Sequence, residues 1–114
     1  MKQEVDDVGF IRALAKKLKT EYRVEKYFAI GMSNGGLMSY RLACEASDVF
    51  SAIGSVAGTD NTIDCTPSRA IPVMHIHALD DQNVLYNGGC GPACQGKNWA
   101  TEFTSVPDTI TKWV

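Results

Sequence analysis

The sequence predicts an α/β fold with a mainly parallel sheet flanked by helices. Three observations lead to this class: apolar residues recur at helical spacing near the N-terminus, short β-rich apolar runs follow, and helical and strand-like segments alternate along the chain. Alternation of this kind is typical of parallel sheets, whose strands are joined by helical crossovers. Only three strands are predicted, and the edges of so thin a sheet need a partner. The pattern therefore also predicts pairing with further polypeptide or with a second copy.

The first half of the chain reads as helix, strand, turn and helix. Apolar residues between Val5 and Leu18 lie three or four positions apart, which predicts an amphipathic helix. The run 26–32, KYFAIGM, is apolar without clean alternation, which predicts a strand covered on both faces. Helical spacing returns in 35–47, GGLMSYRLACEAS. A tight turn must join these last two segments.

The second half begins with two more predicted strands, around 52–57 and 71–77. The loop between them contains Asp60, and the turn-rich stretch 78–104 follows the second strand. A cap signal then appears, because Ser105 precedes an early proline and an acidic residue three positions on. A helix is therefore predicted to begin there.

Composition narrows the functional classes. The 114 residues are 45% hydrophobic and 21% charged, with a formal net charge of -2, which indicates an ordinary globular composition of at most one domain. No basic stretch exceeds Lys16-Lys17, so nucleic acid is not an expected partner. No apolar segment approaches the roughly 20 residues of a membrane span, and the acidic N-terminus does not resemble a signal peptide. We expect a soluble chain with no membrane partner.

The central motif is the octapeptide 30–37, IGMSNGGL, in which Ser33 lies between glycines at a predicted strand-to-helix turn. Gly-x-Ser-x-Gly in this context is the pattern of a nucleophile elbow, which exposes a serine hydroxyl above the sheet. Gly31 and Gly35 are expected to be required because they have no Cβ to collide with the strand and helix. The Asn34 backbone N–H, at the helix N-terminus, is the expected oxyanion donor. The alternative is a glycine-rich turn that binds phosphate or only packs tightly.

A serine nucleophile of this type needs a later acid and then a histidine. Asp80 and Asp81 follow the third predicted strand, at the same edge of the sheet as Ser33. The only two histidines, His75 and His77, precede these acids and share one face of that strand, so a hydrogen-bonded structural role is expected for them. The predicted triad therefore lacks its base.

Two further groups of residues have competing interpretations. The two histidines with Cys90 and Cys94 have the ligand types of a zinc site, but the histidines point along a buried strand, and we expect no metal. Three aromatic residues are either wall residues of an acyl pocket or plain core: Tyr86, Trp99 and Phe103. The four cysteines allow two disulfides in three pairings and also a reduced state, so they leave the compartment open.

Three segments carry a family resemblance: 31–59, GMSNGGLMSYRLACEASDVFSAIGSVAGT; 72–89, PVMHIHALDDQNVLYNGG; and 105–114, SVPDTITKWV. They resemble the α/β-hydrolase esterases of the polyhydroxybutyrate depolymerase and feruloyl esterase type, over nearly the whole chain. The family's elbow is Gly-Met-Ser-Asn-Gly-Gly, its acid lies in a His-Gly-x-x-Asp segment, and Tyr-x-Gly-Gly follows.

The resemblance implies a role for several residues. Ser33 takes the place of the nucleophile and Asp81, rather than Asp80, that of the acid, with Ala78 where the family has glycine. It further implies disulfides Cys44–Cys65 and Cys90–Cys94 and an extracellular or periplasmic location, since family members are commonly exported. Residues 1–114 are then expected to be a single core segment of such a hydrolase, without the N-terminal strands and the C-terminal part that bears the histidine.

Taken together, these observations predict a serine carboxylic-ester hydrolase that acts through an acyl-enzyme and needs no cofactor. Ser33 and Asp81 are the expected catalytic residues and Asn34 the oxyanion donor. The alternative function is an inactive hydrolase fragment that needs a complementing chain or forms a homodimer. Which ester is cleaved stays open.

Overall fold

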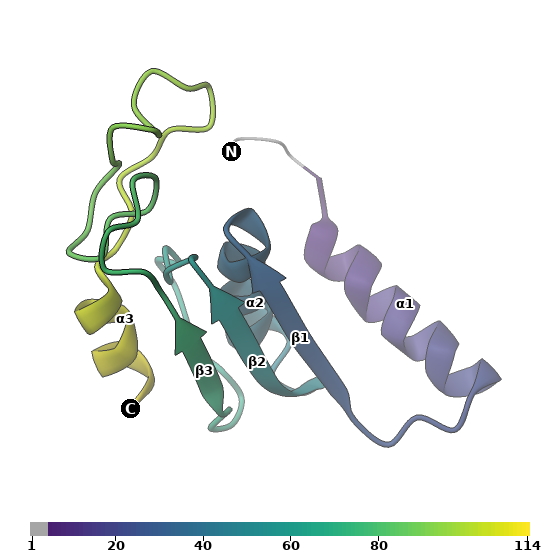
Figure 1. The fold of residues 1–114 in the computed structure, drawn as a ribbon. Coiled ribbons are helices and arrows are strands. Elements are labelled where there is room, and N and C mark those ends of the chain that lie inside the picture. Colours follow the sequence, from purple (N-terminus) through teal and green to yellow (C-terminus); the bar gives the residue numbers. More distant parts are fainter. Residues whose placement is uncertain (1–4) are drawn as a thin grey trace.

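A computed structural model describes residues 5–114, and Figure 1 shows its arrangement. Three parallel strands are flanked by helices, although no helix lies between the second and third strands, and this arrangement agrees with the predicted α/β class. The elements, in chain order, are α1 (Asp7–Glu21), β1 (Tyr27–Met32), α2 (Asn34–Glu45), β2 (Phe50–Val56), β3 (Val73–Ile76) and α3 (Val106–Trp113). None of the helices in this part of the chain is long and apolar enough to cross a membrane.

The sheet has the order β1-β2-β3, and both neighbouring pairs are parallel. Ile30 of β1 lies opposite Gly54 of β2, which lies opposite Met74 of β3. The carboxyl ends of all three strands therefore meet at one edge of the sheet. This edge carries the turn after β1 and the loop after β3, where the candidate site residues are found.

Caps define where the first and last helices begin. Asp6 caps α1, because its carboxylate accepts a hydrogen bond of 2.9 Å from the Gly9 N–H. At the other end of the chain, the Ser105 hydroxyl accepts from the Asp108 N–H at 3.1 Å, and Pro107 lies in the first turn of α3. The helix start predicted at Ser105 is therefore confirmed.

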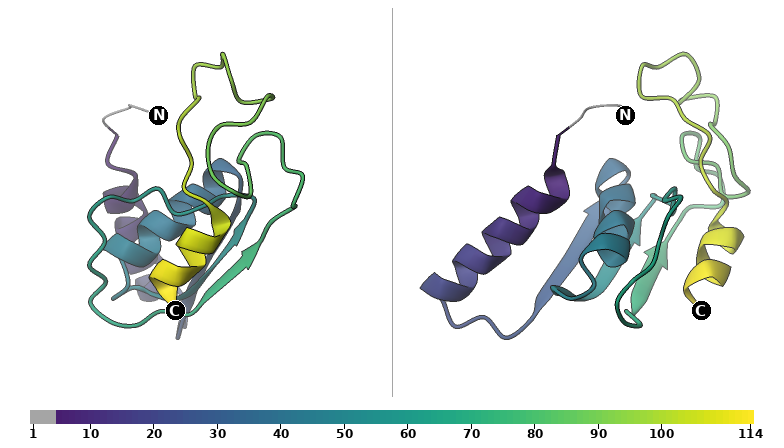
Figure 2. Two further views of the ribbon diagram at one scale, coloured as in Figure 1. Left: turned by 90° about the vertical axis from the view of Figure 1, so that its left-hand side faces the viewer. Right: turned by 180° about the vertical axis from the view of Figure 1, so that it is seen from behind.

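All three helices pack on the same side of the sheet, as the two views of Figure 2 show. The core forms between them and the sheet, around the fully buried Tyr40 of α2 and Ile53 of β2. A second, smaller cluster of Val84, Cys94 and Phe103 holds the irregular segment 78–105 together. The polypeptide thus forms two layers, with the irregular segment 78–105 above the carboxyl edge (Figure 1).

The opposite face of the sheet is bare in the described residues. Its five large apolar side chains are between 56% and 79% exposed: Phe28, Ile30, Met32, Met74 and Ile76. The prediction that the run 26–32 is covered on both faces is therefore wrong for residues 5–114, because every helix described lies on the other side. A parallel sheet normally buries both faces. We use the name "bare face" for this surface.

Candidate active site

Ser33 lies in the sharp turn between β1 and α2, with its side chain exposed. Its backbone has φ 55° and ψ −114°, a region that residues with a Cβ rarely adopt and that costs of order 1–3 kcal/mol. Two hydrogen bonds hold this conformation: the Ser33 N–H donates to the Val56 carbonyl at 2.7 Å, and the Leu37 N–H donates to the Ser33 carbonyl at 3.1 Å. The hydroxyl is therefore presented to solvent by a strained, anchored backbone.

Glycines around this turn allow a very close approach of strand and helix. A Cβ on Gly31 would lie 2.2 Å from the Gly35 carbonyl oxygen, so the expected requirement for glycine at 31 is confirmed. The same expectation for Gly35 is wrong, because a Cβ there would meet nothing within 4 Å. The other crowded positions are Gly36, whose Cβ would lie 2.2 Å from Ser55 Oγ, and Gly58, whose Cβ would lie 2.4 Å from the Ser33 carbonyl. Strand β2 and the segment after it thus also shape the turn.

The N-terminus of α2 begins directly after the serine, at Asn34. The Ser33 hydroxyl makes no capping hydrogen bond to this helix, and the first turn contains no acidic residue. The partial positive charge of the helix end is thus left without a carboxylate in its own first turn. An oxyanion formed at Ser33 would lie beside this end.

Asp81 is oriented by the loop that follows β3. Its Oδ1 accepts hydrogen bonds from the Asn83 N–H at 2.8 Å and the Val84 N–H at 3.0 Å. The side chain is only 13% exposed. Asp80 is exposed, and it is its backbone carbonyl that accepts from Gln82. Of the two acids, Asp81 is the one with a fixed carboxylate.

Ser33 and Asp81 follow β1 and β3, which lie on either side of β2. Strands in a sheet are about 4.8 Å apart, so the two strand ends are separated by about 10 Å. Ala78, at the start of the acid loop, has no positive φ, so alanine is accommodated there without strain.

His75 and His77 are engaged in a chain of hydrogen bonds, which confirms their expected structural role. The Tyr40 hydroxyl lies 2.6 Å from His75 Nδ1, and His75 Nε2 lies 3.1 Å from His77 Nδ1. His77 Nε2 in turn lies 2.7 Å from the Val84 carbonyl. Both imidazoles have partners on both nitrogens, so neither is free to serve as the base of Ser33.

Burial, and then the nearby His77, lower the pKa of His75. An unfolded histidine has a pKa of about 6.5, so below that pH the unfolded chain binds a proton that the folded chain does not. The free energy of unfolding should therefore decrease on acidification through pH 6.5, by at most about 1.4 kcal/mol per pH unit for this one group. Urea denaturation at pH 7.5 and pH 5.5 measures the change, and equal midpoints would contradict it. His75→Gln should flatten the dependence.

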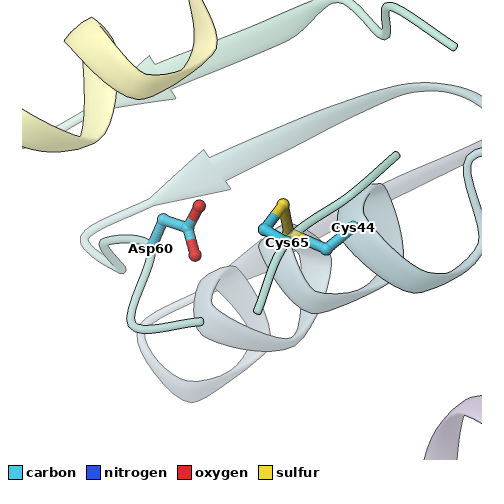
Figure 3. Close-up of side chains that lie close together, drawn as sticks. All are labelled: Cys44, Asp60 and Cys65. Atoms are coloured by element: carbon cyan, nitrogen blue, oxygen red, sulfur yellow. A yellow bond between two sulfur atoms is a disulfide. The ribbon is translucent and has the colours of Figure 1, made fainter. Parts of the chain in front are cut away.

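Both disulfides implied by the family resemblance are present, Cys44–Cys65 and Cys90–Cys94. The zinc alternative loses two of its four ligands, because the sulfurs of Cys90 and Cys94 are bonded to each other. Cys44, Cys65 and Asp60 also lie close together, as Figure 3 shows. Their two sulfurs are likewise in a disulfide, so this cluster does not have free thiolates to offer a metal.

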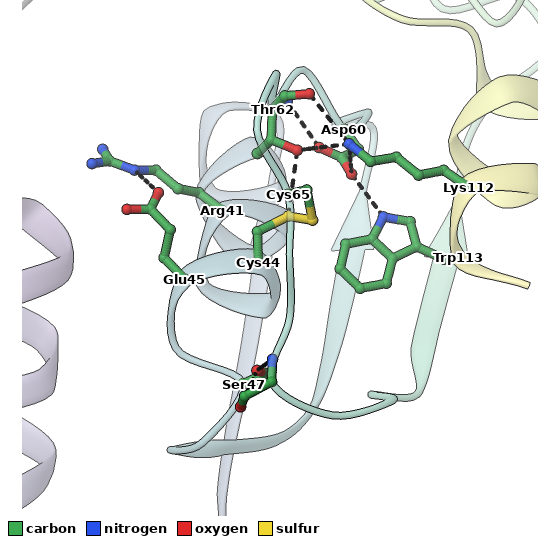
Figure 4. The surroundings of a disulfide bond; sticks show 10 residues. Arg41, Cys44, Glu45, Ser47, Asp60, Thr62, Cys65, Lys112 and Trp113 are labelled. Carbon is green, nitrogen blue, oxygen red and sulfur yellow. Dashed lines mark hydrogen bonds and ion pairs between the residues drawn. A yellow bond between two sulfur atoms is a disulfide. The ribbon is translucent and has the colours of Figure 1, made fainter.

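Asp60 is a buried carboxylate that sequence reasoning did not single out. Its Oδ2 accepts from Trp113 Nε1 at 2.7 Å and lies 3.0 Å from Lys112 Nζ, so both contacts come from α3 (Figure 4). Its Oδ1 accepts from the Thr62 N–H and hydroxyl. The side chain has no exposed surface. Asp60 therefore fastens α3 to the loop after β2, which is also tied to α2 by Cys44–Cys65.

A cavity of about 360 Å³ opens beside the serine. Its walls are mainly apolar, with Leu37, Trp99 and Phe103 facing the polar groups of Ser33 and Asn34. Trp99 and Phe103 both line this cavity, and Phe103 is at the same time a buried member of the second core cluster. Tyr86 instead packs edge-on against His77, with ring centroids 6.1 Å apart. A larger cavity of 710 Å³ lies near the amino ends of the strands, around Arg12 and Lys16, away from the serine.

Comparison with known proteins connects this arrangement to esterases. Over an alignment of 117 positions, gaps included, which covers 96% of the chain, it is 33% identical to feruloyl esterase B of Piromyces equi. It is 36% identical over 95 residues, 77% of the chain, to the probable feruloyl esterase C of Aspergillus clavatus. The identity to feruloyl esterase C of Emericella nidulans is 33% over 91 residues, 74% of the chain.

The resemblance to feruloyl esterases is confirmed. The chain spans 22%, 33% and 32% of the length of these three feruloyl esterases. No protein-family model and no solved structure matches it. The similarity is therefore to one part of these longer proteins, and to the first of them it extends over 96% of the chain.

Proposed function

We propose that the chain is the central part of an α/β-hydrolase that cleaves carboxylic esters. The observation that carries the proposal is the exposed, strained Ser33 between β1 and the N-terminus of α2, in a chain similar to feruloyl esterases. This is the geometry that a nucleophile elbow requires. The crowded glycines of the turn support it, since they allow strand and helix to approach closely on either side of the serine.

In the proposed reaction, Ser33 Oγ attacks the ester carbonyl and forms an acyl-enzyme, which water then hydrolyses. The Asn34 N–H stabilises the oxyanion, and Asp81 orients a histidine that accepts the serine proton. That histidine comes from polypeptide outside residues 1–114, because His75 and His77 are occupied elsewhere. The reaction uses no cofactor and no metal.

For the substrate, we propose an ester of ferulic acid or a related aromatic acid. The names of the relatives support this class, and the cavity beside Ser33 supports it independently. Trp99 and Phe103 offer flat apolar surfaces, which suit an aromatic acyl group better than a charged one.

The location we propose is extracellular or periplasmic. Two disulfides in a chain of this length favour an oxidising compartment. No membrane or nucleic acid enters the proposal as a partner.

Further polypeptide completes the fold in this proposal. The relatives are three to five times as long as the matched segment, and the bare face exposes large apolar side chains. A parallel sheet buried on both faces needs a second layer there. The second candidate is an inactive fragment that requires a complementing chain or a homodimer; the bare face and the missing base favour it.

The proposal is tested by an active-site probe on the purified chain. A fluorophosphonate should label Ser33 slowly, because the turn and helix N-terminus are present while the base is not. Ser33→Ala should abolish both the labelling and the slow release of p-nitrophenol from p-nitrophenyl acetate. Ser68→Ala, which removes another exposed serine, should change neither. Equal signals from wild type and Ser33→Ala in a folded sample would favour the inactive fragment.

A further inference from the structure

The chain of hydrogen bonds from α2 through β3 ends at the loop that carries Asp81. Tyr40 is fully buried, and the His77 side chain is 1% exposed. His77 Nε2 contacts two groups of that loop: the Val84 carbonyl at 2.7 Å and Asp81 Oδ2 at 3.5 Å. The side chains therefore form a continuous path from the helix that follows Ser33 to the candidate acid.

Each hydrogen bond of this path has a determined direction. The Val84 carbonyl can only accept, so His77 Nε2 must carry a proton and donate. In a neutral ring His77 Nδ1 then accepts from His75 Nε2, and His75 Nδ1 accepts from the Tyr40 hydroxyl. Tyr40 remains protonated because burial, and then the charge of Asp60, raise its pKa. With both imidazoles neutral, this chain of hydrogen bonds therefore places the proton on Nε2 in each ring.

Val84 connects the path to the acid through its own backbone. Its N–H donates to Asp81 Oδ1 at 3.0 Å, while its carbonyl accepts from His77. The Asn83 N–H donates to the same carboxylate oxygen. Because His77 holds the Val84 carbonyl, the Val84 N–H stays on Asp81 Oδ1. The other carboxylate oxygen, Asp81 Oδ2, lies 3.5 Å from His77 Nε2.

We propose that His77 is a positioning residue for Asp81, and that Tyr40 and His75 maintain the tautomer in which it can act. This inference rests on the proposed function for the role of Asp81 as catalytic acid. In the opposite tautomer, an unprotonated His77 Nε2 would face both the Val84 carbonyl and the Asp81 carboxylate. The hydrogen bond that holds the Asp81 loop to His77 would then be lost. Fixed geometry at the acid is what a triad requires of it.

Amide hydrogen exchange tests the positioning directly, because the Asn83 and Val84 amides are bound to the Asp81 carboxylate. In the folded chain, His77→Ala should accelerate the exchange of these two amides by about tenfold or more. His77→Gln supplies an amide N–H that can donate to the Val84 carbonyl, so it should restore much of the protection. Tyr86→Phe is the matched control: Tyr86 packs against His77 without a hydrogen bond to it, and its variant should behave as wild type.

The tautomers are read separately by ¹⁵N NMR of the imidazoles at pH 7.5. Both rings should show a protonated Nε2, and Tyr40→Phe should introduce the Nδ1-protonated form of His75. If His77→Ala does not fold, the tautomers of Tyr40→Phe still test whether Tyr40 and His75 maintain the protonation pattern of His77. Unchanged exchange in a folded His77→Ala, or unchanged tautomers in Tyr40→Phe, would overturn the inference. Neither readout depends on labelling of Ser33, so a failure here is distinct from a failure of the proposed function.

Discussion

Replacement of Asp60 by alanine should lower the free energy of unfolding by about 2–4 kcal/mol, because each buried donor left without its acceptor costs about 1–3 kcal/mol. The variant leaves the Trp113 indole N–H, the Thr62 hydroxyl and the Lys112 ammonium without their common acceptor. Trp113 also packs against Tyr40, with ring centroids 6.1 Å apart, so the loss reaches the core. Urea denaturation followed by tryptophan fluorescence measures the effect.

The same loop contains a matched control. Asp64 is exposed, and Asp64→Ala should change the free energy of unfolding by less than about 0.5 kcal/mol. If Asp60→Ala proves as mild as Asp64→Ala, the carboxylate does not hold α3 in solution. The lysine is the less decisive partner, since its side chain is 34% exposed.

Removal of the Cys44–Cys65 disulfide, by Cys44→Ser with Cys65→Ser, should cost about 3 kcal/mol of stability. The two cysteines are 21 positions apart, and a loop of that length loses this much entropy in the unfolded chain when it is closed. The bond joins α2 to the loop that carries Asp60, so the double variant should also weaken the attachment of α3. Urea denaturation under non-reducing conditions gives the difference.

The second disulfide provides the comparison. Cys90 and Cys94 are only 4 positions apart, and the same relation gives about 2 kcal/mol for so short a loop. The pair Cys90→Ser and Cys94→Ser should therefore destabilise less than loss of Cys44–Cys65. The reverse order would show that packing of Cys94, which is fully buried beside Val84 and Phe103, outweighs loop closure.

The secondary structure was predictable because its signals are local. The glycines around Ser33 require a turn between a strand and a helix, and Ser105 with Pro107 specifies a helix start within four residues. The predicted third strand, 71–77, is longer than β3 at both ends, since backbone pairing with β2 is limited to Val73–Ile76. Local pattern defines the type of an element better than its limits.

Long-range contacts explain what the sequence did not reveal about the site. Asp60 and Trp113 are 53 positions apart, and Tyr40 and His75 are 35 apart. Sequence spacing does not predict a hydrogen bond for either pair. Gly31 was predicted correctly, whereas Gly35 is not crowded, and the other crowded positions, Gly36 and Gly58, depend on the packing of β2 and the segment after it against α2. The choice of Asp81 over Asp80 as the acid depended on resemblance and stays a proposal, although the structure does show that two backbone amides hold the Asp81 carboxylate.

The bare face has a consequence for how this polypeptide folds. Full burial of a large apolar side chain contributes about 1.5–3 kcal/mol. Covering the five partly exposed side chains of the bare face would therefore stabilise the folded state by on the order of 5–10 kcal/mol. That is comparable to the whole net stability of an ordinary domain. If the polypeptide layer proposed above docks there, its binding is linked to folding, and the melting temperature of residues 1–114 would rise with the concentration of that layer.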